Sequence, residues 1–347
     1  MTNSPKKQLG LSLVELMIAI TIGIFLTAGL IQLFTSSKAT YRVQDNLSRL
    51  QENARFAMQI ISRDLRMADY AGCKSGSVND ATNNIDTTSA NYDATIHNFT
   101  SGIDGLNGAA GASIALDDSD TLIIINAADS GVSVQPPFGP LPSSDITITA
   151  GHDFEQGDMI LIADCSQADI FQITNDPSGG TTISHVTGAF NSNPGANQVA
   201  EPGNFNPLPC SATASEHCLS KVYTGEASLY KLTSNTYDIQ AGTNGVNALF
   251  RNNQELIEGI ENMQVLYGED TDNDNTPNYY VPAGTAGLTM ENVVSVRVSL
   301  LTTTLEDNVA TQAIPYTIFG DTVVSPSNDR RIRRVFTSTI ALRNRLP

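Results

Sequence analysis

Residues 10–34 read GLSLVELMIAITIGIFLTAGLIQLF, and this stretch decides the fold of the first part of the chain. From Leu11 to Phe34 it contains 24 residues, of which Glu15 is the one charged residue. About 20 consecutive apolar residues span a bilayer as a helix. A secretory signal has an apolar region of about 7–15 residues with the cleavage site after it. Here the run is longer and the small residue Gly10 precedes it, which predicts a membrane-spanning helix.

The helical pattern continues beyond this apolar run. No proline lies between Pro5 and Pro136. Apolar residues recur three or four positions apart, on one face of a helix; they are Leu47, Leu50, Ala54, Ala57, Ile61, Leu65 and Ala68. The pattern predicts one helix of roughly 60 residues and ~90 Å. Its transmembrane half covers 11–34, its amphipathic half covers 35–72, and Gly72 is expected to end it.

Residues 73–347 carry strand patterns. Within 294–300, Val or Leu alternates with polar residues, so one face of that strand is expected to be buried. Further strands are expected at Thr121–Ile125, Asp145–Thr149, Met159–Ala163, Ile170–Thr174, Thr182–Val186, Ser228–Leu232, Leu249–Asn252, Asn262–Tyr267 and Val335–Leu342. Residues 74–113 and 188–218 are expected to be long loops. The sequence therefore predicts an α+β protein with a long N-terminal α-helix packed on a mainly antiparallel β-sheet body.

The overall composition argues against several functions. The chain has 36 acidic and 19 basic residues, a net charge of −17, which repels the phosphates of nucleic acids. No zinc-protease histidine spacing, nucleophile elbow or phosphate-binding glycine loop occurs. The histidines are scattered at His97, His152, His185 and His217. We therefore expect a protein that is not an enzyme and does not bind nucleic acid through its bulk surface.

Four cysteines allow three disulfide connectivities. They are Cys73, Cys165, Cys210 and Cys218. An even number of cysteines in an exported chain indicates disulfides, and four free buried thiols are the alternative. The short loop between them favours Cys210–Cys218, and the second pair is then Cys73–Cys165.

Residues 270–281, DTDNDNTPNYYV, form a candidate calcium loop. The candidate ligands are Asp270, Asp272, Asp274 and Asn278. Three carboxylates at positions one, three and five can converge on one hard cation. Position six is Asn rather than Gly, and position twelve is Val rather than the bidentate Glu. A ligand from elsewhere, such as Glu269 or Glu291, would be needed, and a polar hairpin tip remains the alternative.

Six arginines gather near the C-terminus: Arg330, Arg331, Arg333, Arg334, Arg343 and Arg345. They predict either a docking strip for an acidic neighbour, or for DNA, or the charged face of an edge strand that resists aggregation.

Glu15 is unusual because a carboxylate in an apolar run costs about 2.5–3.5 kcal/mol on insertion scales. If the chain is cut after Gly10, the new amine of Leu11 is a cation four residues away. That amine is a candidate partner for the Glu15 of a neighbouring subunit. The alternative is an interfacial carboxylate that reaches water.

Gly10 followed by LSLVEL resembles the prepilin processing motif of type IV pilins and type II secretion pseudopilins. The resemblance implies that 1–10 is a leader peptide, that prepilin peptidase cleaves between Gly10 and Leu11, and that Leu11 is N-methylated. It also implies that Glu15 aids assembly. The sequence departs from the motif at Leu11, where the family most often has Phe.

Residues 36–73, 164–174 and 330–346 resemble PilW-like minor pilins. The resemblance implies a subunit that joins other minor pilins at the pilus tip, primes assembly and carries a PilY-type adhesin. It implies an inner-membrane protein with a periplasmic body before assembly and a cell-surface pilus afterwards. The alternatives are a GspJ-like type II secretion pseudopilin and a pilus-borne adhesin or DNA-uptake module.

Overall fold

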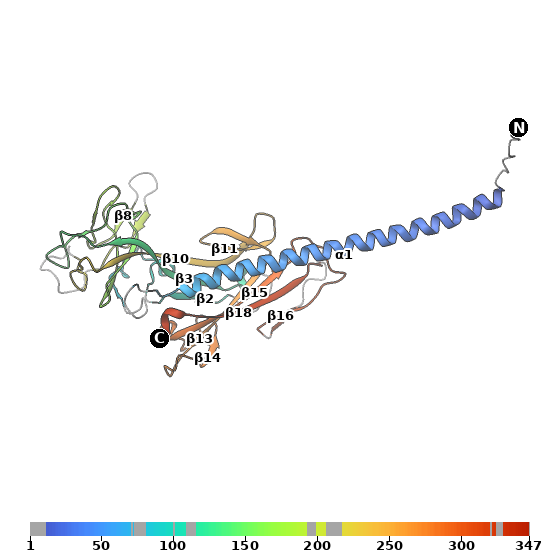
Figure 1. The fold of residues 1–347 in the computed structure, drawn as a ribbon. Coiled ribbons are helices and arrows are strands. Elements are labelled where there is room, and N and C mark those ends of the chain that lie inside the picture. The colour runs from blue at the N-terminus through green and yellow to red at the C-terminus, as the bar shows by residue number, and fades with distance from the viewer. Residues whose placement is uncertain are drawn as a thin grey trace, which may run out of the picture.

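The computed structural model shows one long helix attached to a body of strands (Figure 1). It describes residues 12–70, 72, 81–99, 101–108, 116–192, 199–205, 217–319, 321–323 and 329–346. The helix, α1 (Leu13–Met67), lies along the body with its second half, and its first half projects away from it. This arrangement confirms the predicted α+β class.

The start and end of α1 are fixed by local contacts. The Glu15 backbone N–H donates to Ser12 Oγ at 3.2 Å, and the Ser12 N–H donates to Glu15 Oε2 at 3.0 Å, which is a capping box. The helix ends at Met67, before the predicted stop at Gly72. The reason is Asp69, which has a left-handed φ of 65° and donates its backbone N–H to the carbonyl of Ile125 in the sheet.

The larger sheet has eight strands. Its main path is β1 (Thr82–Asn83), β6 (Ala168–Gln172), β5 (Met159–Ala163), β10 (Ser228–Ala241), β11 (Asn247–Arg251) and β12 (Gln254–Glu258). Off this path, β3 (Thr121–Ser133) pairs with β10 and with β2 (Ile103–Leu106). The long strands β3 and β10 connect the region beside α1 to the far end of the body (Figure 1).

The smaller sheet has four antiparallel strands and carries α1. Its order is β14 (Tyr279–Val281), β13 (Ile260–Glu269), β15 (Val293–Thr303) and β18 (Arg333–Ala341). Three strand pairs are separate: β4 (Ile146–Thr147) with β7 (Thr182–Ile183), β8 (Phe190–Ser192) with β9 (Val199–Glu201), and β16 (Tyr316–Ile318) with β17 (Asp321–Val323). The short helices are α2 (Ala94–His97), η2 (Leu116–Asp118), η3 (Met290–Asn292) and η4 (Arg343–Arg345).

The core beneath α1 joins the helix to both sheets. Ala57, Ile61 and Leu65 of the helix are fully buried and share one apolar cluster with Val298 of β15 and Leu249 of β11. Two further apolar clusters lie in the rest of the body. The predicted amphipathic face is therefore the face that packs.

Both predicted long loops are wrong in part. Within 74–113, Ile103–Leu106 forms strand β2, and within 188–218, strands β8 and β9 pair with each other. Gly105 permits the close packing of β2, since a Cβ there would lie 2.0 Å from the Tyr267 hydroxyl oxygen. Glycine weakens the strand signal in the sequence, so only the tertiary contact shows why the strand forms.

Candidate functional site

The first half of α1 is an uncovered apolar surface. Every residue from Leu13 to Arg42 is exposed, and the relative exposures of Phe25 and Phe34 are 74% and 71%. Among the described residues, α1 is the one helix that is long and apolar enough to cross a membrane. Residues 13–34 all project away from the described body, as the end of the helix in Figure 1 illustrates.

The second half of α1 is held by polar contacts as well as by the core. Arg42 donates to the carbonyls of Asp307 and Asn308 at 3.1 and 2.7 Å. Further along, the Tyr237 hydroxyl donates to Asp64 Oδ2 at 2.6 Å. Packing against the body thus begins near residue 42, some residues after the end of the apolar run.

The predicted processing and assembly residues lie at the projecting end. Gly10 and Leu11 are outside the described residues, so cleavage and N-methylation there stay predictions. Glu15 is described, and its carboxylate accepts the Ser12 backbone N–H at the helix start. Pairing of Glu15 with the amine of a neighbouring subunit also stays a prediction.

The C-terminal arginines do not act as one strip. Arg345 is buried and its Nε lies 2.5 Å from Asp69 Oδ2, just beyond the end of α1. Arg333 is buried against Glu261 and Asp329. Arg334 and Arg343 are exposed. The structure therefore divides the arginines between buried ion pairs that stabilise the body and exposed side chains on its surface.

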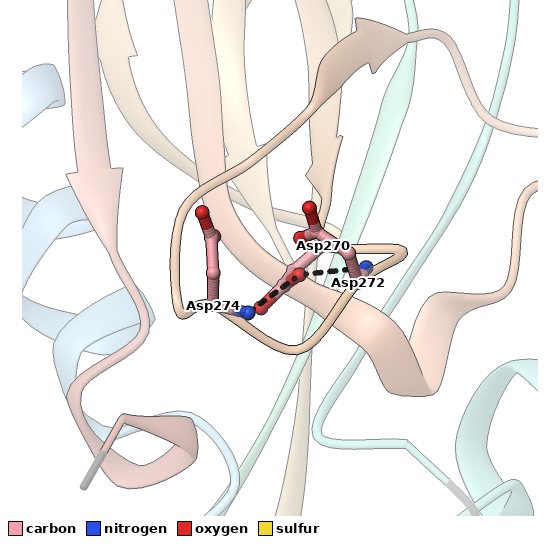
Figure 2. A group of neighbouring side chains, drawn as sticks. All are labelled: Asp270, Asp272 and Asp274. Atoms are coloured by element: carbon pink, nitrogen blue, oxygen red, sulfur yellow. Dashed lines mark hydrogen bonds between the residues drawn. The ribbon is translucent and has the colours of Figure 1, made fainter.

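The candidate calcium ligands lie on the turn between β13 and β14 (Figure 2). One carboxylate oxygen from each of Asp270, Asp272 and Asp274 lies within 4.8 Å of the others. Asp272 and Asp274 are exposed, and Asp270 is buried. Asn275, at position six, has the left-handed φ of 67° that this position requires.

Asp270 organises the turn by accepting backbone N–H groups. They come from Asp272, Asn273, Asp274 and Asn275, at 2.7–3.3 Å. Desolvation raises the pKa of Asp270, but the four donors outweigh it and hold the pKa below its ordinary value.

The side chains of Asn278 and Glu269 accept hydrogen bonds from residues outside the group of three aspartates. Asn278 Oδ1 accepts the backbone N–H and hydroxyl of Thr271 at 2.7 and 2.9 Å. The carboxylate of Glu269 accepts the Tyr279 hydroxyl and the Thr289 N–H. The structure brings the three aspartates together without a fourth protein ligand aimed at them among these residues, so calcium binding stays a prediction.

The structure leaves the predicted disulfide pairing untested. Cys165 and Cys218 are both disulfide-bonded. Cys73 and Cys210 lie outside the described residues, so the pairing Cys73–Cys165 and Cys210–Cys218 stays a prediction.

A buried pair of histidines includes His217, the neighbour of Cys218 in the chain, and no sequence pattern predicts this pair. His185 Nδ1 and His217 Nδ1 are 2.9 Å apart, and His185 Nε2 lies 3.1 Å from the Ser144 carbonyl oxygen. Burial is the main cause that lowers both pKa values, and together with His185 it lowers the pKa of His217 to about 3. The two residues are 32 positions apart, so only the fold brings them together.

Two family models match the chain. Residues 219–344 match the family described as Type IV Pilus-assembly protein W, and residues 5–31 match the Prokaryotic N-terminal methylation motif. Comparisons with curated proteins and with solved structures found no match. The first match covers the strands from β10 to β18, which include the whole sheet that carries α1.

The methylation motif and the apolar helix projecting from an antiparallel body support assignment to the type IV pilins. Within that class, the assembly-protein match makes this chain PilW-like. The resemblance seen in the sequence is thereby confirmed at the level of the family. A pilin of this kind is anchored in a membrane and then assembled into a pilus with other pilins.

Proposed function

We propose that this chain is a minor type IV pilin of the pilus-tip priming complex, which supports pilus assembly, adhesion and twitching motility. The observation that carries the proposal is the exposed apolar half of α1. Burial of apolar surface is worth roughly 25 cal/mol per Å², so such a helix requires lipid or other helices around it. Lipid covers it before assembly, and the helices of neighbouring pilins cover it afterwards.

The proposal assigns each part of the chain a step in this path. Prepilin peptidase removes residues 1–10 and methylates Leu11 at the inner membrane. The body folds in the periplasm, where disulfides form. Glu15 then meets the amine of a neighbouring subunit, and the body joins the other minor pilins and a PilY-type adhesin. No step requires this chain to be an enzyme.

The test is recovery of the other minor pilins with the tagged full-length chain from its host. Glu15→Ala is expected to reduce recovery several-fold, because it removes the partner of the neighbouring amine. Glu52→Ala is a matched control, since Glu52 is an exposed carboxylate on the second half of the same helix. Mass spectrometry of the purified chain is expected to show loss of residues 1–10 and one methyl group on Leu11.

Two outcomes would contradict the proposal. Retention of the first ten residues in the mature protein would show that the chain is not cleaved after Gly10. Co-purification with type II secretion pseudopilins in place of minor pilins would favour the GspJ-like alternative.

A further inference from the structure

A wide groove runs between the second half of α1 and strand β18. Its volume is about 1050 Å³, just above the range of roughly 300–1,000 Å³ that is usual for ligand pockets. Met58 of α1 and Phe336 of β18 are half-buried and supply apolar lining surface. The groove is therefore a partly apolar channel on the outside of the sheet that carries α1.

The charge of this groove is opposite to that of the protein. Four exposed arginines line it: Arg55, Arg63, Arg66 and Arg343. No described aspartate or glutamate lines it, although the chain carries a net charge of −17.

These four arginines have no ion-pair partner among the described residues. Of the other nine described arginines, five each pair with a carboxylate of the chain: Arg42, Arg49, Arg251, Arg333 and Arg345. The remaining four have no such pair in the described part of the chain, but none of them lines the groove; they are Arg297, Arg330, Arg331 and Arg334. In so acidic a protein, a cluster of unpaired arginines indicates that the complementary carboxylates come from another molecule.

Strand β18 gives the groove a second recognition element. Among the described strands, β18 pairs only with β15, so its other edge has no hydrogen-bonded strand partner there, although β16 lies close to β18. A free edge presents backbone N–H and C=O groups to which an extended segment can pair. Residues 336–338 of β18 line the groove directly.

The dimensions suit an extended segment. From Arg55 to Arg66 the helix rises about 16 Å, a distance that an extended chain covers in about five residues. Successive carboxylates on one face of such a strand can therefore meet the arginines along α1 while its backbone pairs with β18.

We infer that the groove between α1 and β18 binds an acidic, extended segment of a neighbouring pilus subunit, which adds a strand to β18. The inference rests on the proposed function, because it supplies the subunit that provides the segment. It adds a specific docking element to an assembly otherwise held by the apolar half of α1.

The experiment measures binding of a fluorescein-labelled peptide of alternating Glu and Val to the full-length processed chain in detergent micelles. The unaltered chain is expected to bind the peptide, with affinity that falls as salt rises. Arg63→Glu with Arg66→Glu is expected to weaken binding roughly tenfold, because two attractive contacts become repulsive. Both side chains are exposed, so the variant is expected to keep its melting temperature.

The controls separate this site from general charge attraction. Arg49→Glu changes an exposed arginine on the same helix outside the groove and is expected to bind like the unaltered chain. A peptide of alternating Lys and Val, and a Glu peptide with proline at the alternate positions, are expected not to bind. The proline peptide keeps the charge but cannot pair with a strand edge.

Equal weakening by Arg49→Glu, or equal binding of the proline peptide, would overturn the inference. Sedimentation that shows self-association lost in the Arg63 and Arg66 variant would also overturn it, in favour of a second copy as the occupant. None of these outcomes touches the proposed function, which is tested by processing of the N-terminus and by Glu15.

Discussion

The two halves of α1 share one continuous helix but differ in what covers them. From Leu13 to Phe34 all residues are exposed, whereas Leu50, Ala57 and Ile61 are at most 2% exposed. The first half is apolar on all sides, and the second is apolar on one face. A helix that is apolar all round requires a medium or partners on every side, and an amphipathic helix requires one packing surface.

One helix therefore packs in two different environments. The second half completes the core of its own chain. The first half is left for lipid and for other subunits. Changes in the second half should therefore alter the stability of the body, and changes in the first half should alter only assembly.

Loss of the ion pair at the end of α1 is expected to have the largest effect on stability. In Arg345→Met, Asp69 would remain fully buried without its cation, and such a loss costs about 3–5 kcal/mol of unfolding free energy. Urea unfolding followed by tyrosine fluorescence measures it, since the chain has ten tyrosines and no tryptophan. Arg343→Met, at an exposed position two residues away, should change the unfolding free energy by less than about 0.5 kcal/mol.

The second prediction compares the same substitution in the two halves of the helix. Ile61→Ala creates a cavity in the core and should cost about 2–5 kcal/mol of unfolding free energy. Ile24→Ala removes a side chain that is 64% exposed, so the stability of the body should be unchanged within about 0.5 kcal/mol. Recovery of the other minor pilins should instead fall in Ile24→Ala. Equal destabilisation by both variants would contradict the division of the helix.

The third prediction concerns pH and the far end of the body. The folded state lowers the pKa of His217 from 6.5 to about 3, so the unfolded state binds the proton first as pH falls. The stabilising effect of the neutral ring is complete above pH 6.5 and is lost towards pH 3. In His217→Gln, the decrease in unfolding free energy over this range should be shallower by up to about 1.4 kcal/mol per pH unit.

The measurement is urea unfolding at a series of pH values. His152→Gln, outside the pair, serves as the control and should keep the slope of the unaltered chain. Carboxylates such as Asp329, whose pKa is also lowered, titrate in both variants and cancel in the comparison. Identical slopes for His217→Gln and the unaltered chain would exclude the pair as a source of acid sensitivity.

Calcium is expected to have the smallest effect. At about ten times its dissociation constant, a ligand specific for the folded state adds about 1.4 kcal/mol of stability. The melting temperature should therefore rise slightly with Ca²⁺, and Asp272→Asn with Asp274→Asn should remove this response. Asp153→Asn, at another exposed position, should keep it. An unchanged response in the double variant would place any calcium elsewhere.

Much of the fold could be predicted because its signals are local. Met159–Ala163 was predicted as a strand and is strand β5 with the same bounds. Strands β3 and β10 are longer than predicted, since polar residues such as Asn126 and Thr236 continue the pairing. The end of α1 was predicted too late because its stop depends on contacts of Asp69 with residues distant in sequence.

The candidate sites also divide into those formed by residues close in the sequence, which could be predicted, and those formed by distant segments, which could not. The aspartates at 270, 272 and 274 are close in sequence, so their grouping followed from spacing and is present in the structure. The histidine pair and the arginine groove join distant segments, and no periodicity indicates them. Arg333 and Arg345 looked like surface charges in the sequence but are buried ion-pair residues.

The sequence by itself determined the apolar helix, its cleavage motif and the face of its second half, because apolar periodicity fixes which side of a helix must be buried. Tertiary structure alone decided which strands cover that face, which arginines are paired and which remain available. Those choices depend on contacts between residues far apart in the chain, where burial and charge pairing are settled only once the sheets have formed.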